Sequence, residues 1–218
     1  MWTEKYKPKR LDEVVGHEKL KSVIRKCIKA GDMPHFLFHG IIPGTGKTLI
    51  AELIGRELLG EVFDENFIEI NASDDRTVQK MRDIVLNAIK HSTINGHLRI
   101  ILLDEMDGVL EPAMALLRRP MEKSNRTRFI LTANDEKSII EPIKSRCMCF
   151  EFKPLRKEDI LKRLIFIRDN EKVNIELSEI ERIAKDSMGS MRRAITELEK
   201  ASMADNGEDE LLRRYVRK

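Results

Sequence analysis

The sequence has few of the residues that characterise disulfide-linked, zinc-binding or membrane-spanning proteins. Its three cysteines, Cys27, Cys147 and Cys149, cannot all pair, and Cys147-x-Cys149 has no second pair or nearby histidine to complete a zinc site. No apolar run approaches the ~18 residues needed to span a bilayer, and the N-terminus lacks a signal-peptide pattern. We therefore expect a reduced, cytoplasmic protein that makes no contact with a membrane.

An excess of charge of one sign is also absent. The sequence holds 40 Lys and Arg against 37 Asp and Glu, and the resulting net charge of +3 is too small to indicate nucleic-acid binding by itself. Aromatic residues make up 5%, hydrophobic residues 41% and charged residues 35% of the chain. This composition is typical of a soluble, helix-rich globular protein, and the length suits one large or two small domains.

Short apolar runs alternate with longer helical patterns in the N-terminal two thirds of the chain. The runs are nearly continuous in apolar character, as expected for strands covered on both faces, and they are Phe36–His39, Phe67–Asn71, Arg99–Leu103, Arg128–Ala133 and Met148–Phe152. Helices are predicted at Glu18–Ala30, Lys47–Leu59, Val78–Lys90 and Pro112–Arg119. Pro120 should stop or kink the last of these helices.

This alternation predicts an α/β fold with a parallel five-stranded sheet, which we assign to a domain of residues 1–153. After Pro154 the strand pattern ends, and three amphipathic helical patterns follow. We therefore predict a small α-helical lid domain over residues 154–218.

The stretch HFLFHGIIPGTGKTLIAELIG, residues 35–55, contains most of a phosphate-binding loop. That loop reads Gly, four residues, then Gly-Lys-Ser/Thr between a strand and a helix. Gly46, Lys47 and Thr48 match its end, but the first position is Ile41 and the nearest glycine, Gly40, comes one residue too early. Backbone N–H groups from Gly44 to Thr48 can surround phosphate oxygens at a helix N-terminus, and the Thr48 hydroxyl can reach Mg²⁺. The alternative is an ordinary glycine-rich turn.

Acidic residues follow the third predicted strand, in RIILLDEMD. Asp104 is placed to hold Mg²⁺ through water, and Glu105 to polarise an attacking water molecule. Acidic residues at a strand end also occur in solvated turns. Their position after a phosphate loop and an intervening strand favours a site for nucleotide hydrolysis.

Eight motifs extend this pattern over residues 2 to about 203. In order they are WTEKYKPKRLDEVVG, PHFLFHG with PGTGKT, NASDDR, LLDEMD, ALLRR, RFILTAN, IIEPIKSRC and GSMRRAI. In that order and spacing the sequence resembles the small subunit of replication factor C, the archaeal and eukaryotic sliding-clamp loader of the AAA+ ATPase superfamily.

The resemblance implies a set of residues that bind and hydrolyse ATP with Mg²⁺. Around the adenine and along the phosphates, the implied residues are Tyr6, Pro8, Val15, Gly16, Pro43, Gly44, Thr45, Gly46, Lys47, Thr48 and Leu49. The implied catalytic residues are Lys47, Glu105, Asn134 as sensor 1, Arg192 as sensor 2, and Arg146 as an arginine finger acting on a neighbouring subunit. A hydrophobic anchor at Tyr6 and solvated arginines are the plainer interpretations.

The resemblance also implies contact with DNA through the helix after NASDDR. In the family this helix lines a central channel, and here Arg76, Lys80, Arg82 and Lys90 would neutralise phosphates without reading bases. Ile84 and Leu86 stand where relatives often carry basic residues. A solvated helix face is the alternative.

The implied function is that of an ATP-dependent clamp-loader subunit in DNA replication. Its partners would be the large subunit, further small subunits, the sliding clamp and primer–template DNA, and in a prokaryote it would work at the nucleoid. Relatives continue beyond this length into a helical collar, so the chain would be a truncation, a paralogue or a short form. Two rivals stay open. One is a branch-migration helicase, which needs a winged helix after the lid, and the other is an assembly module that binds ATP with little hydrolysis.

Overall fold

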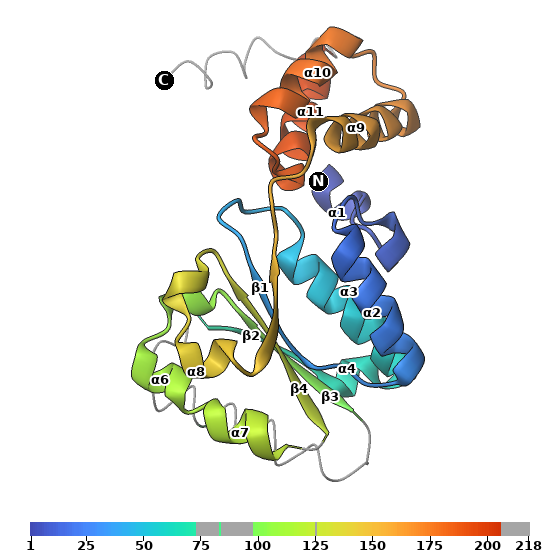
Figure 1. Cartoon of the computed structure of the whole chain (residues 1–218). Helices are drawn as coiled ribbons and strands as arrows, with labels where there is room; N and C mark the ends of the chain where they lie inside the picture. Colours follow the sequence, from blue (N-terminus) through green and yellow to red (C-terminus); the bar gives the residue numbers. More distant parts are fainter. Residues whose placement is uncertain (73–82, 84–97, 125, 206–218) are drawn as a thin grey trace. The chain divides into compact units, whose positions relative to one another are not determined.

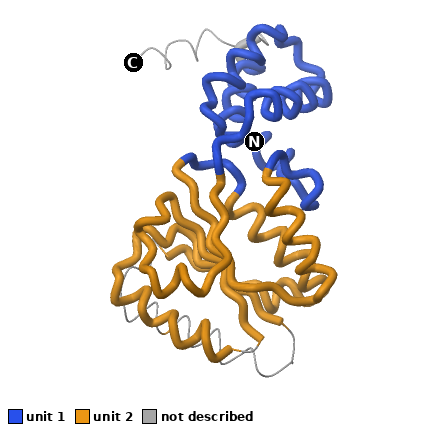
Figure 2. The backbone as a smooth tube through the Cα atoms, in the orientation of Figure 1, with its two compact units in different colours: residues 1–16, 42–46, 153–218 blue, residues 17–41, 47–152 orange. Residues whose placement is uncertain are grey.

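The computed structural model describes residues 1–72, 83, 98–124 and 126–205. Their contacts divide the chain into two compact units, coloured separately in Figure 2. Unit 1 comprises Met1–Gly16, Ile42–Gly46 and Lys153–Lys218, and unit 2 comprises His17–Ile41 and Lys47–Phe152. Most of the expected helix Val78–Lys90 lies outside the described residues.

Unit 2 contains the predicted parallel sheet, which is confirmed (Figure 1). Its strand order is β2-β3-β4-β1-β5, and each neighbouring pair is parallel. The strands are β1 (His35–His39), β2 (Phe67–Asn71), β3 (Arg99–Asp104), β4 (Thr127–Ala133) and β5 (Cys147–Glu151). Each lies within one residue of its predicted position, because the apolar runs that bury a strand on both faces end where the sheet ends.

Helices cover both faces of this sheet. One face carries α2 (Glu18–Ala30), α3 (Lys47–Leu59) and α4 (Phe63–Asn66), and the other carries α6 (Glu111–Ala115), α7 (Arg118–Lys123) and α8 (Glu141–Lys144) (Figure 1). Short 3-10 turns complete the unit at Gly60–Val62, Met106–Gly108 and Glu136–Ser138. The central strands are therefore buried, which explains why their sequences show no alternation of polar and apolar residues.

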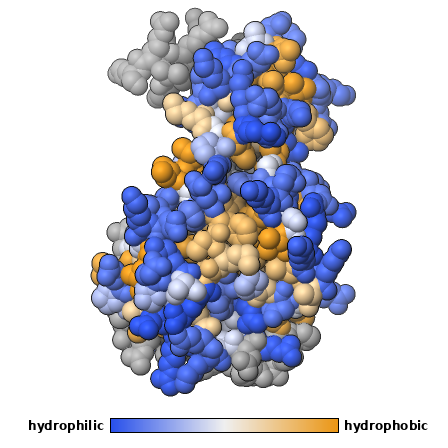
Figure 3. Space-filling view, in the orientation of Figure 1, coloured by the Kyte–Doolittle hydropathy of each residue, from blue (hydrophilic) through white to orange (hydrophobic). Residues whose placement is uncertain are grey.

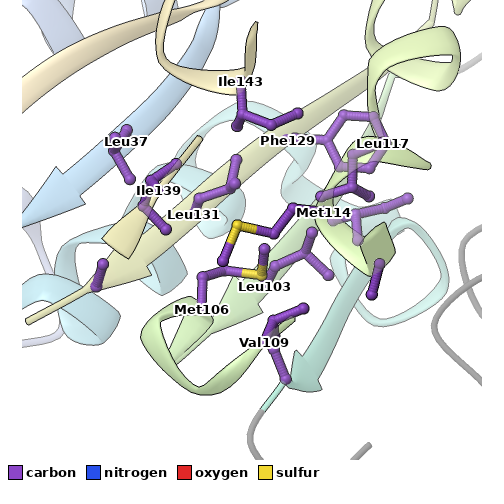
Figure 4. Packing of buried hydrophobic residues seen from close by; sticks show 14 of the residues in the cluster. Leu37, Leu103, Met106, Val109, Met114, Leu117, Phe129, Leu131, Ile139 and Ile143 are labelled. Atoms are coloured by element: carbon purple, nitrogen blue, oxygen red, sulfur yellow. The ribbon is translucent and has the colours of Figure 1, made fainter. Parts of the chain in front are cut away.

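The main apolar core of unit 2 lies between the sheet and the helices α6 to α8. Leu37, Leu103, Leu131 and Phe129 supply the sheet side of this cluster. From the other side it receives, in Figure 4, Met106, Val109, Met114, Leu117, Ile139 and Ile143. This packing holds the residues that follow β3 and β4 in fixed positions.

Strand β5 forms one edge of the sheet and is less covered than the other strands. Met148 in this strand is 43% exposed, and Cys149 is also exposed. Figure 3 shows an apolar area, surrounded by hydrophilic residues, in the part of unit 2 where β1 and β5 run in Figure 1. The other edge of the sheet is β2, Phe67–Asn71.

The prediction of one helix at Pro112–Arg119 is wrong in its details. The structure has two short helices, α6 and α7, separated by a turn at Leu116 and Leu117. Pro120 does not end a helix, because it lies in the first turn of α7. Backbone N–H groups in the first turn have no partner within the helix, so a proline there loses no hydrogen bond.

Unit 1 contains the three expected lid helices, α9 (Lys157–Glu171), α10 (Leu177–Asp186) and α11 (Met191–Asp205). Their apolar faces form one cluster, which includes Ile160, Leu164, Ile180 and Leu198. A short N-terminal helix, α1 (Trp2–Lys5), and a 3-10 turn at Leu11–Glu13 belong to the same unit, and Trp2 and Tyr6 pack against this cluster.

The two contact units differ from the expected division into residues 1–153 and 154–218. The boundary at Lys153 agrees to within one residue, but residues 1–16 and 42–46 group with the helices instead of the sheet. The N-terminal segment does so because Trp2 and Tyr6 bury their side chains against α9 to α11. That these parts are separate domains stays a prediction. Among the described residues, no helix is both long and apolar enough to cross a membrane.

His35, at the start of β1, gives the fold a dependence on pH. The backbone N–H of Phe129 donates to His35 Nδ1 at 3.0 Å, so Nε2 carries the proton and donates to the Met121 carbonyl at 3.0 Å. The bond from Phe129 requires the neutral ring, because a protonated Nδ1 cannot accept, and burial lowers the pKa of His35. Because the pKa of His35 is lower in the folded protein, this histidine stabilises the fold at pH values above its unfolded pKa of about 6.5. The stabilisation is lost as the pH falls through the folded pKa.

We predict that the free energy of unfolding falls between pH 7.5 and 5.5 by more in the wild type than in His35→Gln. At pH 7.5 the variant should be less stable by about 1–3 kcal/mol, because a buried N–H and a carbonyl lose their partner. Urea denaturation at several pH values measures both effects. Equal pH slopes for the two proteins would show that His35 does not titrate with folding.

Candidate functional site

Three neighbouring strands of unit 2 end at the edge of the sheet where the predicted site residues lie. β3, β4 and β1 are adjacent and parallel, so their carboxyl ends meet. The phosphate-loop sequence follows β1, Asp104 is the last residue of β3, and Asn134 follows β4. The topology therefore brings together residues that are separated by up to 87 positions in the sequence.

Lys47 and Thr48 begin α3 directly after the loop. The Lys47 ammonium donates to the Gly40 carbonyl at 2.8 Å and to Asn134 Oδ1 at 3.3 Å. The Thr48 hydroxyl lies 3.1 Å from each carboxylate oxygen of Asp104. These contacts connect the start of α3 to the ends of both β3 and β4.

Glu105 has an unusual backbone conformation. Its φ of 57° is in the left-handed region, which is uncommon for a residue other than glycine and is often found at functional sites. Its side chain is exposed, and its N–H donates to Thr132 Oγ1 at 3.0 Å. The same Thr132 hydroxyl donates a short hydrogen bond to Asp104. The backbone thus turns sharply at the strand end, directly after Asp104.

Two residues of this arrangement were missed by the sequence reasoning. Thr132 is the polar residue in the apolar run RFILTAN, and that interruption was the only sign of its contacts. Asp107 closes the motif LLDEMD. Its carboxylate accepts the Asn134 backbone N–H at 2.6 Å and the side-chain amide at 3.2 Å. Asp107 therefore fixes the orientation in which Asn134 presents its amide oxygen to Lys47.

The donor set at Thr48 and Asp104 fits Mg²⁺. This ion prefers oxygen ligands and keeps several waters, so it is bound by one or two protein groups together with substrate phosphates. A hydroxyl and a carboxylate 3.1 Å apart at a helix N-terminus match that requirement. Within residues 1–72, 83, 98–124 and 126–205, no group of three or more His, Cys, Asp or Glu is arranged to hold a metal ion alone.

The loop residues Ile42–Gly46 belong to unit 1, where they contact the start of α11. The N–H groups of Met191 and Arg192 lie 3.1 and 3.5 Å from the Gly44 carbonyl. Gly44 has a φ of 75°, and a Cβ there would lie 2.6 Å from Ser190 Oγ and 2.7 Å from Arg192 Cβ. Only glycine allows this close approach, so the packing explains why glycine occupies position 44, between the positions that the phosphate-loop pattern fixes.

The remaining loop residues have less specific environments. Thr45 is buried, and its hydroxyl donates to the Ile42 carbonyl at 3.2 Å. Gly46 has a φ of 104°, Pro43 is exposed and Leu49 is half-buried. Ile41 is 81% exposed, so its side chain makes little contact within the chain. Arg192 is exposed as well.

The residues expected around the adenine also lie in unit 1. The Tyr6 hydroxyl donates a short hydrogen bond to Glu171, its carbonyl accepts from Arg163 at 2.8 Å, and its ring packs edge-on against Phe166. Burial raises the pKa of Tyr6 to about 12, and the bond to Glu171 adds to the rise. Pro8 and Val15 are half-buried, as is Gly16 with its φ of 76°. These contacts anchor the N-terminal segment, and the adenine role stays a prediction.

Arg146 lies at the opposite end of the sheet from Lys47 and Thr48. It precedes Cys147, which pairs with His35 at the amino end of β1, so the length of β1, roughly 17 Å, separates it from the carboxyl end of that strand. Its guanidinium donates to Glu122, at 3.0 Å from Nε, and to the Pro142 carbonyl at 2.6 Å. The Arg146 guanidinium holds the pKa of Glu122 below its usual range.

Beside Arg146 the surface of unit 2 is hollowed. The pocket has a volume of about 480 Å³ and is lined by Asp32, Met33, Pro34, His35, Arg128 and Arg146. Arg128 is paired there with Asp32 at 2.8 Å. The expected DNA-binding residues, Arg76, Lys80, Arg82 and Lys90, lie outside the described residues.

Comparisons with known proteins agree with this geometry. Residues 36–155 match the model of the ATPase family associated with various cellular activities (AAA). The chain is 43% identical to "Replication factor C small subunit 2" of Pyrobaculum islandicum and 45% identical to the replication factor C small subunit of Staphylothermus marinus. These alignments cover 94% and 93% of the chain but only 64% and 62% of the relatives. The chain thus spans less than two thirds of their length.

Solved structures show a similar fold. The Holliday junction branch migration motor RuvB of Thermotoga maritima is 24% identical, with a TM-score of 0.71 over 89% of this chain and 64% of that chain. A structure of a variant of the same RuvB protein is 22% identical with a TM-score of 0.73, over the same shares of both chains. These structures and the family match confirm the expected AAA fold. The curated relatives confirm the resemblance to replication factor C small subunits.

The packing of Gly44 against α11 predicts a difference between two glycine substitutions. Gly31→Ala is the control, because Gly31 also has a positive φ, of 64°, but no atom within 4 Å of an added Cβ. Both variants should lose about 1–2 kcal/mol from backbone strain. Gly44→Ala should also weaken ATP binding at least tenfold, about 1.4 kcal/mol, because its Cβ displaces Ser190 and Arg192. Titration with a fluorescent ATP analogue measures this, and equal affinities of the two variants would contradict it.

Proposed function

The chain belongs to the ATPase family associated with various cellular activities (AAA), and we propose that it binds and hydrolyses ATP as a small subunit of a replication factor C-type clamp loader. One observation carries the catalytic part of the proposal. Lys47, Thr48, Asp104, Glu105 and Asn134 come together at the carboxyl ends of three adjacent strands. These are the residue types that phosphoryl transfer from ATP requires.

Each residue has a role that its position supports. The loop N–H groups and the Lys47 ammonium bind the phosphates, and Thr48 and Asp104 hold Mg²⁺. When bound, Mg²⁺ neutralises charge on the phosphate oxygens. Glu105, exposed beyond the strand end, accepts a proton from the attacking water. Asn134, held by Asp107, orients that water.

Two arginines complete the proposed site. Arg192 follows Met191, whose backbone N–H bonds to the Gly44 carbonyl. This position next to Gly44 supports a contact of Arg192 with the γ-phosphate as sensor 2. Arg146 lies at the amino end of β5, so the five residues of β1, roughly 17 Å, separate it from the carboxyl end of β1. We therefore assign Arg146 to the nucleotide of an adjacent subunit, where its charge stabilises the transition state. ATP hydrolysis then depends on assembly.

The partners follow from the relatives, which are named as replication factor C small subunits. We propose that the chain assembles with a large subunit and further small subunits, binds a sliding clamp and primer–template DNA in the cytoplasm, and helps to load the clamp in DNA replication. Arg76, Lys80, Arg82 and Lys90 remain the proposed phosphate contacts to DNA. The likeness to RuvB concerns the fold and adds no second function.

A clamp- and DNA-stimulated ATPase assay tests this proposal. The protein is assembled with its loader subunits and assayed alone, with the clamp, and with the clamp and primed DNA. We expect both additions to raise the rate. If neither the clamp nor the primed DNA raises the rate while ATP is still bound, the chain is instead an assembly module with little hydrolysis.

The matched variant for this assay is Glu105→Gln, which keeps the shape of the side chain but removes its charge. Loss of the proton acceptor should lower single-turnover hydrolysis by roughly 10²–10⁴-fold, while ATP binding stays within about twofold of the wild type, a difference near 0.4 kcal/mol. Unchanged single-turnover hydrolysis would remove Glu105 from this role.

A further inference from the structure

The Thr132 hydroxyl contacts both acidic residues at the end of β3. It accepts the Glu105 N–H at 3.0 Å and donates a short hydrogen bond to Asp104 Oδ1. Thr132 is only 2% exposed, and its place follows from register, since the preceding pair of the two strands is Leu103 with Leu131. This hydroxyl is therefore fixed between Asp104 and the backbone of Glu105.

The two bonds of Thr132 determine each other. A hydroxyl has one proton to donate, so donation to Asp104 leaves its lone pairs for the Glu105 N–H. Glu105 is held in the left-handed region at a φ of 57°, a conformation that costs about 1–2 kcal/mol for residues other than glycine. Such a conformation persists only where neighbouring groups hold it, and Thr132 is the group that bonds its N–H.

The Asp104 carboxylate accepts hydrogen bonds from two hydroxyl groups on different elements. Thr132 donates from β4, and Thr48 lies 3.1 Å away at the start of α3. A carboxylate between two donors has its plane fixed, so both of its oxygens, each 3.1 Å from the Thr48 hydroxyl, are presented in one orientation. Groups one step removed from a metal ligand commonly control its orientation and basicity in this way.

We propose that Thr132 is a positioning residue that sets the orientation of the Asp104 carboxylate and the backbone conformation of Glu105 together. Through this one hydroxyl, the magnesium side of the site and its water-activating side are held in a fixed relation. The inference rests on the proposed roles of Asp104 and Glu105 in ATP hydrolysis. Thr132 itself touches neither nucleotide nor water in this scheme.

Thr132→Val tests the proposal, because valine has nearly the same shape and removes only the hydroxyl. We expect single-turnover hydrolysis and the Mg²⁺-dependent gain in ATP affinity each to fall by about 10–100-fold, as is typical for groups that orient metal ligands. ATP affinity in the absence of Mg²⁺, measured by calorimetry, should change by less than about twofold. Thr132→Ser retains the hydroxyl and should restore most of both losses.

Thr127→Val is the matched control. Thr127 lies in the same strand and is fully buried, but its hydroxyl has no hydrogen-bond partner among the described residues. This variant should hydrolyse ATP at the wild-type rate. If it loses as much activity as Thr132→Val, or if Thr132→Ser loses as much, the effect comes from packing in β4 and the proposal is wrong. Should Thr132→Val not fold by circular dichroism, Thr132→Ala removes the hydroxyl without adding a contact and is measured in its place.

Failure of this inference can be separated from failure of the proposed function. If the assembled wild type does not hydrolyse ATP, or if Glu105→Gln hydrolyses it normally, the proposed function itself is wrong and the inference falls with it. If the wild type is active, Glu105→Gln is inactive, and Thr132→Val binds Mg²⁺–ATP and hydrolyses it normally, only the role of Thr132 is overturned.

Discussion

The Asp104 carboxylate is the point on which the candidate site depends. It accepts hydrogen bonds from the hydroxyl groups of Thr48 at the start of α3 and Thr132 in β4. These contacts exist only because β3, β4 and β1 are adjacent and parallel, so that their carboxyl ends meet at one edge. The order of the strands, and the apolar packing that maintains it, thus determines which polar groups share one small volume.

Much of this arrangement could be predicted from the sequence, because it depends on local patterns. Apolar runs located all five strands to within one residue, and Gly46-Lys47-Thr48 located the loop. The contacts of Thr132 and Asp107 could not be predicted, because they depend on register between strands that are distant in the chain. The sequence placed the helix end at Pro120, but the structure breaks the segment earlier, between α6 and α7. A proline after a helical pattern predicts a helix end, whereas the first turn of a helix accepts Pro120.

Arg146 marks the other end of the same sheet. It follows α8 at the amino end of β5, where its guanidinium bonds to Glu122 and to the Pro142 carbonyl. The residues proposed to bind the phosphates and the arginine proposed to act on them therefore belong to opposite ends of one parallel sheet. A chain organised in this way carries both halves of the proposed shared site but does not bring them together by itself, which is the physical reason to expect activity only between subunits.

The most direct test of this account mixes two inactive subunits. Arg146→Ala keeps Lys47, and Lys47→Ala keeps Arg146, so each variant assembled alone should be inactive. In an equal mixture, about a quarter of the head-to-tail interfaces would combine an intact Lys47 with a neighbour's intact Arg146. If Arg146 acts on the neighbouring subunit's nucleotide, ATP hydrolysis in these mixtures recovers to about that fraction of the wild-type rate. Mixtures that assemble but stay inactive, under conditions where wild-type subunits hydrolyse ATP, would contradict it.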